Sequence, residues 1–163
     1  MGRLALNVVP VLSFQWEKRA ADTVAGAENQ MGPVRFSRLE PSGTLAAAGA
    51  PIAYGSDWPV DPLDEWFALK VGVTRRNDPA AGPIYVAPLP GPGLTVAQAV
   101  HAITGGAAYE LREEAVAGSL EPGKFADLIL IDRDIFHGDP ATIAQTKVKF
   151  TMVGGKVVYT AAD

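Results

Sequence analysis

The chain has 163 residues, a net charge of -4, 48% hydrophobic and 20% charged residues, which describes a folded globular protein and excludes a disordered one. The acidic balance argues against a nucleic-acid partner, and no stretch has the length of a membrane span. The absence of cysteine excludes disulfides, thiolate metal ligands and thiol nucleophiles, and fits a cytoplasmic protein. Two close basic groupings, Arg75–Arg76 and Lys147 with Lys149, are expected on solvated faces.

The N-terminal residues 4–13 are apolar on both faces, which is typical of a buried strand in a parallel sheet. The charged start and apolar run also resemble a signal peptide. However, Asn7 and Pro10 interrupt the run, and residues 15–19 replace the small-residue cleavage site. We therefore expect a buried strand here.

The middle of the chain predicts two helices around a second strand. The first helix is expected over residues 37–48, the strand over 50–55, and the second helix over 64–71 with Asp64 at its cap. Residues 77–93 are rich in proline and glycine and predict a long loop.

A third helix is expected over residues 94–103, with Thr95 as its N-cap. Gly105–Gly106 either ends this helix or precedes another one that begins at Ala107. After residue 115 the pattern changes to β structure. A strand is expected over 126–132, and a hairpin forms from 148–153 and 156–159 around Gly154–Gly155.

The segment from Tyr54 to Val60 carries the strongest candidate for chemistry. A short apolar run leads into Asp57, which is flanked by small residues, and a Trp-Pro pair closes the turn. A carboxylate just past the C-terminal end of a barrel strand lies where barrel enzymes carry out their reactions. Taken alone, however, the segment is equally consistent with a carboxylate that only caps the next helix or shapes a turn.

Three stretches together resemble the C-terminal portion of the amidohydrolase superfamily. They are GSDWPV, then LTVAQAVHAITGGAAYELREEAVAGSLEPGKFADLILIDRDIF, then VKFTMVGGKVVY. The nearest branch looks like the metal-dependent "amidohydrolase 3" hydrolases of TIM-barrel fold. The resemblance extends from about residue 5 to residue 160 and is weakest across 14–35 and 77–93.

This resemblance implies an α/β fold, namely the C-terminal part of a TIM barrel (its last two βα units) plus part of a small β-sandwich domain. Residues 4–13 would be the seventh barrel strand, 50–56 the eighth, and 95–106 the helix after it. Residues 1–115 would therefore belong to the (β/α)8 barrel, and 116–163 would be the C-terminal strands of the sandwich. In this family, strands from upstream of the barrel complete that sandwich.

The resemblance also implies the chemistry. Asp57 maps onto the family's catalytic carboxylate, which accepts a proton from a metal-activated water during attack on a carbonyl and passes it to the leaving nitrogen. Asp57 is also the one expected metal contact of this chain, and the expected divalent metal is zinc, with iron or manganese compatible. Ser56 and Trp58 are the candidates for binding a small-molecule substrate, with packing at the strand end as the alternative for Trp58.

The family's histidine metal ligands are missing, because the chain corresponds to the region after the sixth strand. It contains two histidines, and both His101 and His137 are expected to be structural or surface residues. We therefore expect a C-terminal fragment of a hydrolase of carbon–nitrogen bonds in non-peptide amides or cyclic amides, inactive as an isolated chain.

Alternatively, a partner chain supplies the missing strands. Two rival interpretations are a non-catalytic barrel remnant that acts as an interaction or regulatory module and an unrelated α/β binding domain.

Overall fold

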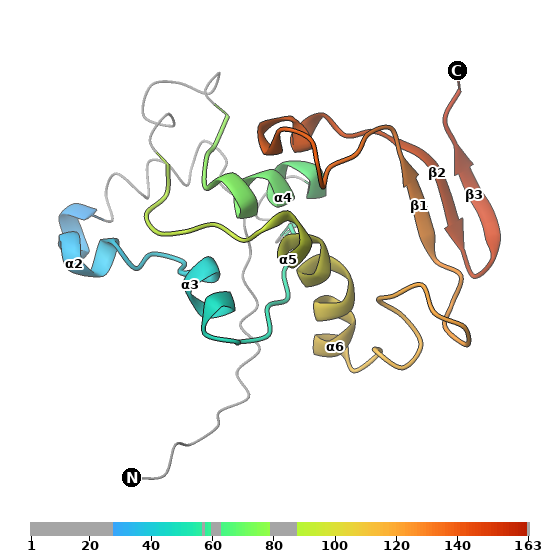
Figure 1. The fold of residues 1–163 in the computed structure, drawn as a ribbon, viewed down its shortest axis with the longest axis horizontal. Coiled ribbons are helices and arrows are strands. Elements are labelled where there is room, and N and C mark those ends of the chain that lie inside the picture. The colour runs from blue at the N-terminus through green and yellow to red at the C-terminus, as the bar shows by residue number, and fades with distance from the viewer. Residues whose placement is uncertain (1–27, 57, 60–62, 79–87, 163) are drawn as a thin grey trace, which may run out of the picture.

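The computed structural model describes residues 28–56, 58–59, 63–78 and 88–162. This part of the chain is α/β, with a group of short helices beside a small antiparallel sheet (Figure 1). None of the helices in the described ranges combines the length and apolar character that a membrane crossing requires. The strand expected over residues 4–13 lies outside the described residues.

The elements follow one another in a simple order. They are α2 (Pro33–Phe36), α3 (Ser42–Ala47), α4 (Glu65–Thr74), α5 (Val96–His101), the π-helical turn η3 (Ala102–Gly106), α6 (Ala107–Leu111), β1 (Leu128–Ile131), the 3-10 helix η4 (Pro140–Gln145), β2 (Val148–Val153) and β3 (Lys156–Thr160).

The helix predicted over residues 94–103 is confirmed, and so is its cap. Thr95 Oγ1 accepts a hydrogen bond from the Gln98 amide at 3.2 Å, and Gln98 Oε1 accepts one from the Thr95 amide at 2.9 Å. This reciprocal pair is a capping box. Gly105–Gly106 does not end the helix, because α5 continues through η3 into α6.

The helix that begins near Asp64 is also confirmed. The Asp64 carboxylate accepts a hydrogen bond from the Phe67 amide at 3.0 Å, and α4 runs three residues beyond the predicted end. The single helix expected over 37–48 is wrong, because only Ser42–Ala47 forms α3. Pro41 has no amide hydrogen and disfavours helical backbone in Glu40, whose φ is 44°.

The sheet has the order β1–β2–β3, with both neighbouring pairs antiparallel. The predicted hairpin is confirmed. Gly154 and Gly155 have φ angles of 56° and 76°, the left-handed backbone that a two-residue hairpin turn requires at both positions. The strand expected over 126–132 is shorter, at Leu128–Ile131.

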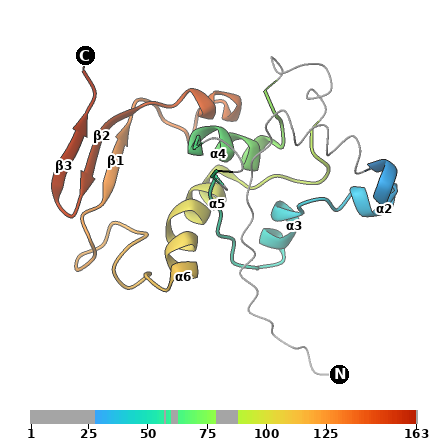
Figure 2. The same cartoon turned by 180° about the vertical axis from the view of Figure 1, so that it is seen from behind.

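The core joins the helices to the β-rich C-terminal part. Leu69 of α4, Tyr54 and Leu94 belong to the same buried cluster as Ile135 and Ile143, which come from the segment between β1 and β2. Figure 2 shows α4 lying beside the 3-10 helix that precedes β2. Residues on both sides of position 115 therefore share one core, and the division into barrel and sandwich domains stays a prediction.

Two expectations about the middle of the chain are wrong. The strand over 50–55 is reduced to a single bridge at Ala53 among the described residues. Arg75 does not lie on a solvated face, since it is only 3% exposed. Its left-handed backbone at the end of α4 turns the side chain inward, where Nη2 donates to Leu39 O at 3.0 Å and Pro90 O at 3.1 Å.

Candidate functional site

The segment that leads to Asp57 is buried, as the sequence predicted. Ile52, Ala53, Tyr54 and Ser56 are all shielded from solvent. The Tyr54 amide donates a hydrogen bond to Ala102 O at 3.3 Å, which attaches this segment to the helix formed by α5, η3 and α6. A mostly buried segment thus precedes the position at which the carboxylate is expected.

The three predicted site residues have different outcomes. Asp57 lies outside the described residues, so its catalytic and metal-binding roles stay predictions. Ser56 is 5% exposed, whereas Trp58 is 67% exposed. The structure therefore places Ser56 inside the protein and leaves most of Trp58 exposed, and the substrate-binding role of each stays a prediction.

Tyr54 is a buried titratable group beside this segment that the sequence analysis did not single out as functional. Burial raises the pKa of its hydroxyl, and the negative charge of Glu65 raises the pKa further. The phenol is therefore neutral at physiological pH and can take part in hydrogen bonds, but it is not available as a phenolate base.

The described residues do not form a metal site. Among them, no group of three or more histidine, aspartate or glutamate side chains is close enough to hold a metal ion. His101 lies at the end of α5. His137 is on the surface loop after β1, where its Nδ1 is 2.7 Å from Asp134 Oδ2. The two histidines thus lie on different elements, and both are exposed, in agreement with their expected structural or surface roles.

The acidic side chains after β1 stabilise turns. Asp132 Oδ1 accepts a hydrogen bond from the Lys147 amide at 2.9 Å, and Asp134 Oδ1 accepts from the Phe136 amide at 2.9 Å. Hydrogen bonds from the Arg133 side chain and the Lys147 amide lower the pKa of Asp132 to about 2. These carboxylates are structural groups of the loop.

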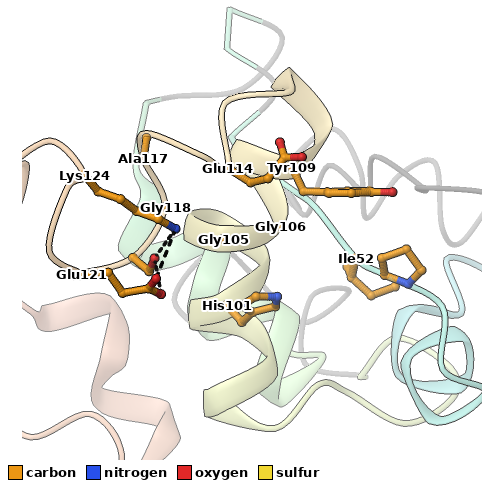
Figure 3. A pocket seen from close by; sticks show the side chains of 12 residues that line it. Ile52, His101, Gly105, Gly106, Tyr109, Glu114, Ala117, Gly118, Glu121 and Lys124 are labelled. Atoms are coloured by element: carbon orange, nitrogen blue, oxygen red, sulfur yellow. Dashed lines mark hydrogen bonds and ion pairs between the residues drawn. The ribbon is translucent and has the colours of Figure 1, made fainter.

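A cavity of about 620 Å³ lies beside the helix formed by α5, η3 and α6 (Figure 3). Ile52, His101, Tyr109 and Lys124 contribute to its walls, and Lys124 Nζ is hydrogen-bonded to Ser119 Oγ at 2.6 Å. Ile52 begins the buried segment whose other end carries Ser56. This cavity therefore lies against the start of that segment, and no pattern in the sequence predicts it.

The chain is similar to known proteins over nearly its whole length. A family model described as the amidohydrolase family (Amidohydro_3) matches residues 6–159. The chain is 31% identical over 117 residues to the putative amidohydrolase YtcJ of Bacillus subtilis, covering 71% of this chain and 22% of that protein. It is 30% identical over 139 residues to the LONG AFTER FAR-RED 3 protein of Arabidopsis thaliana, covering 85% of this chain and 23% of that protein. It thus spans less than a quarter of these curated relatives.

Solved structures give a similar picture of partial coverage. An amidohydrolase from Thermotoga maritima MSB8 aligns with a TM-score of 0.49 and 22% identity, over 88% of this chain and 36% of that one. An uncharacterized protein aligns with a TM-score of 0.53 and 17% identity, over 94% of this chain and 35% of that one. At 17% identity this second likeness describes the fold alone.

Proposed function

The chain belongs to the amidohydrolase family, and on that premise we propose that it is the C-terminal part of a hydrolase that cleaves carbon–nitrogen bonds in small non-peptide amides or cyclic amides. It comprises, in this proposal, the last two βα units of a TIM barrel and part of a β-sandwich. The observation that carries the proposal is the family match over residues 6–159, which includes the GSDWP segment at the end of a buried run.

The amidohydrolase family is generally metal-dependent, and the metal that we propose for the complete enzyme is zinc. The described residues do not fit such a site, since they bring no three potential ligands together. We therefore propose that the ligands come from chain outside these residues, either in a longer polypeptide or in a partner chain. The contribution of this chain is the carboxylate of Asp57.

Asp57 is proposed to move the proton. During hydrolysis, the attacking water must lose a proton and the leaving nitrogen must gain one, and a single positioned carboxylate can carry out both transfers. Support comes from the buried backbone of residues 52–56, which would hold such a carboxylate in a fixed position. The exposed indole of Trp58 and the hydroxyl of Ser56 are the proposed substrate contacts.

The test is Asp57→Asn in the complete enzyme, that is, in the longer protein or the complex that supplies the metal ligands. Loss of a general base lowers the turnover rate by at least about 100-fold, whereas the amide preserves the shape of the side chain. Asp64→Asn is the matched control. Asparagine caps a helix as well as aspartate does, so this variant retains activity. Turnover of Asp57→Asn above about a tenth of the wild-type rate would contradict the proposal.

A second candidate function is a non-catalytic interaction or regulatory module. The observation in its favour is that no metal-ligand group exists among the described residues. The two candidate functions predict different properties for the complex between this chain and a partner that supplies the metal ligands. Metal-dependent hydrolysis of amides by the complex supports the enzyme, whereas a stable complex that retains no metal and hydrolyses nothing supports the module.

A further inference from the structure

A second cavity, of about 340 Å³, lies at the junction of α4 and η4. It is within the volume range of small-molecule sites in proteins. The end of α4 and the residues after it contribute Lys70, Arg76, Asn77 and Asp78, and η4 contributes Gln145. The proposed hydrolase chemistry uses none of these residues, so this cavity needs a separate explanation.

Lys70 is the central charged group of this cavity. Its side chain is nearly buried, at 7% exposure of the residue, and Nζ lies 5.1 Å from the centre of the Phe67 ring. Nζ donates to Arg76 O and to Asn77 O, both at 2.8 Å. These two bonds fix the ammonium group at the cavity wall. They use two of its three hydrogens, which leaves one donor to the cavity among the described residues.

Asn77 adds a second hydrogen-bond donor that lacks an acceptor beside this cavity. Its backbone carbonyl is taken by Lys70, and its Oδ1 accepts the Asp78 amide at 2.7 Å. Its Nδ2, in contrast, is buried and has no hydrogen-bond acceptor among the described residues. Buried polar groups in proteins are almost always paired, so an amide nitrogen left without an acceptor beside a cavity indicates a missing acceptor.

The charges around the cavity favour an anion. Lys70 and Arg76 carry positive charges, and Asp78 carries the one negative charge among the described lining residues, in a chain whose net charge is -4. Hydrogen bonds from an ammonium group and an amide to an ionised oxygen are stronger than those to neutral acceptors. Asp78 opposes such binding and limits its strength.

We propose that this cavity binds a small oxyanion, a carboxylate or a phosphate, through Lys70 Nζ and Asn77 Nδ2. The anion would supply the acceptors that the wall lacks. The inference rests on the local contacts at this junction and does not depend on the proposed hydrolase function.

The experiment is a titration of the 15N-labelled 163-residue chain with sodium phosphate, sodium acetate or sodium chloride at constant ionic strength, followed through the backbone amide signals of residues 76–78, which every variant retains. We expect a saturable shift with phosphate or acetate, and the anion that saturates identifies its chemical class. At ten times the dissociation constant, the bound anion lowers the unfolding equilibrium constant about elevenfold.

Asn77→Asp is the decisive variant. It removes the Nδ2 donor and adds a negative charge, yet keeps the oxygen that accepts the Asp78 amide. We expect it to weaken binding by at least about tenfold, because a charge-assisted hydrogen bond is replaced by repulsion. Lys70→Met should also abolish binding, and Asn77→Asp keeps the test valid if that variant does not fold.

Lys149→Met is the matched control, because this exposed lysine of β2 lies outside the cavity. It should bind as the wild type does. Three results would overturn the proposal. They are a linear response to every anion, wild-type affinity in Asn77→Asp, or an equal loss of affinity in Lys149→Met, which would indicate nonspecific charge attraction.

Discussion

A Cβ atom at Gly106 would collide with the carbonyl oxygen of Ile52. The helix formed by α5, η3 and α6 therefore contacts the segment that leads to Asp57 through a position where only glycine fits. Together with the hydrogen bond from the Tyr54 amide to Ala102 O, this contact sets how closely the buried segment lies against the helix. Gly106, which interrupts the apolar pattern, is thus explained by packing and not by helix termination.

Gly106→Ala should therefore destabilise the fold. The added methyl group must push the helix away from Ile52, and overpacking of this kind costs about 1–3 kcal/mol in the free energy of unfolding. Urea denaturation followed by circular dichroism measures the effect. Gly55→Ala is the matched control, since a Cβ at Gly55 would meet no atom of the described residues within 4 Å. Equal stability of the two variants would show that the contact is not tight.

The acid sensitivity of the fold should depend in part on Asp132. Hydrogen bonds from the Arg133 side chain and the Lys147 amide lower the pKa of this carboxyl group from 3.8 to about 2. A carboxyl group with a lowered pKa in the folded state stabilises the fold above its ordinary pKa. That contribution is lost as the pH falls through the folded-state value. Wild-type protein should therefore lose stability from about pH 4 to about pH 2.

Asp132→Asn removes this titration, so its stability should be lower at neutral pH and should fall less steeply between those pH values. Denaturant midpoints measured across the range test the difference. Glu113→Gln, which changes an exposed carboxylate after α6, should follow the wild-type curve. Parallel acid curves for Asp132→Asn and wild type would contradict the assignment.

The local elements were predictable where short-range chemistry determines them. Thr95 and Gln98 satisfy each other's backbone groups within one turn, and Gly154–Gly155 supplies the left-handed backbone of a tight hairpin. Asp64 likewise caps α4 from three residues away. In these cases the residues that decide the structure lie next to one another in the sequence.

Long-range contacts explain what sequence reasoning missed. The burial of Arg75 depends on Leu39 and Pro90, which are 36 and 15 residues away in the chain. The cavity beside Lys70 depends on the packing of η4 against α4, and the sequence of neither segment indicates that the two pack together. The candidate site was identified through its resemblance to a family, and the structure describes its neighbours Ser56 and Trp58 but not Asp57.

The last prediction concerns self-association through the exposed edge of the sheet. Its edge strand β3 carries exposed apolar side chains at Val157, Val158 and Tyr159, and exposed Ile129 and Leu130 lie on β1. An uncovered edge strand with apolar side chains can pair with strands of other molecules, and natural proteins prevent this with charged residues such as lysine. We therefore expect the isolated chain to associate as its concentration rises, with β3 as a principal contact.

Val158→Lys should reduce this association, because a charge at the centre of β3 is costly to bury between paired strands. Light scattering after size-exclusion chromatography, over a range of concentrations, compares the variants. Val34→Lys on α2 is the matched control. It makes the same substitution at a valine that is 70% exposed, against 61% for Val158, but far from the sheet. If both variants reduce association equally, net charge is responsible and the β3 edge is not the contact.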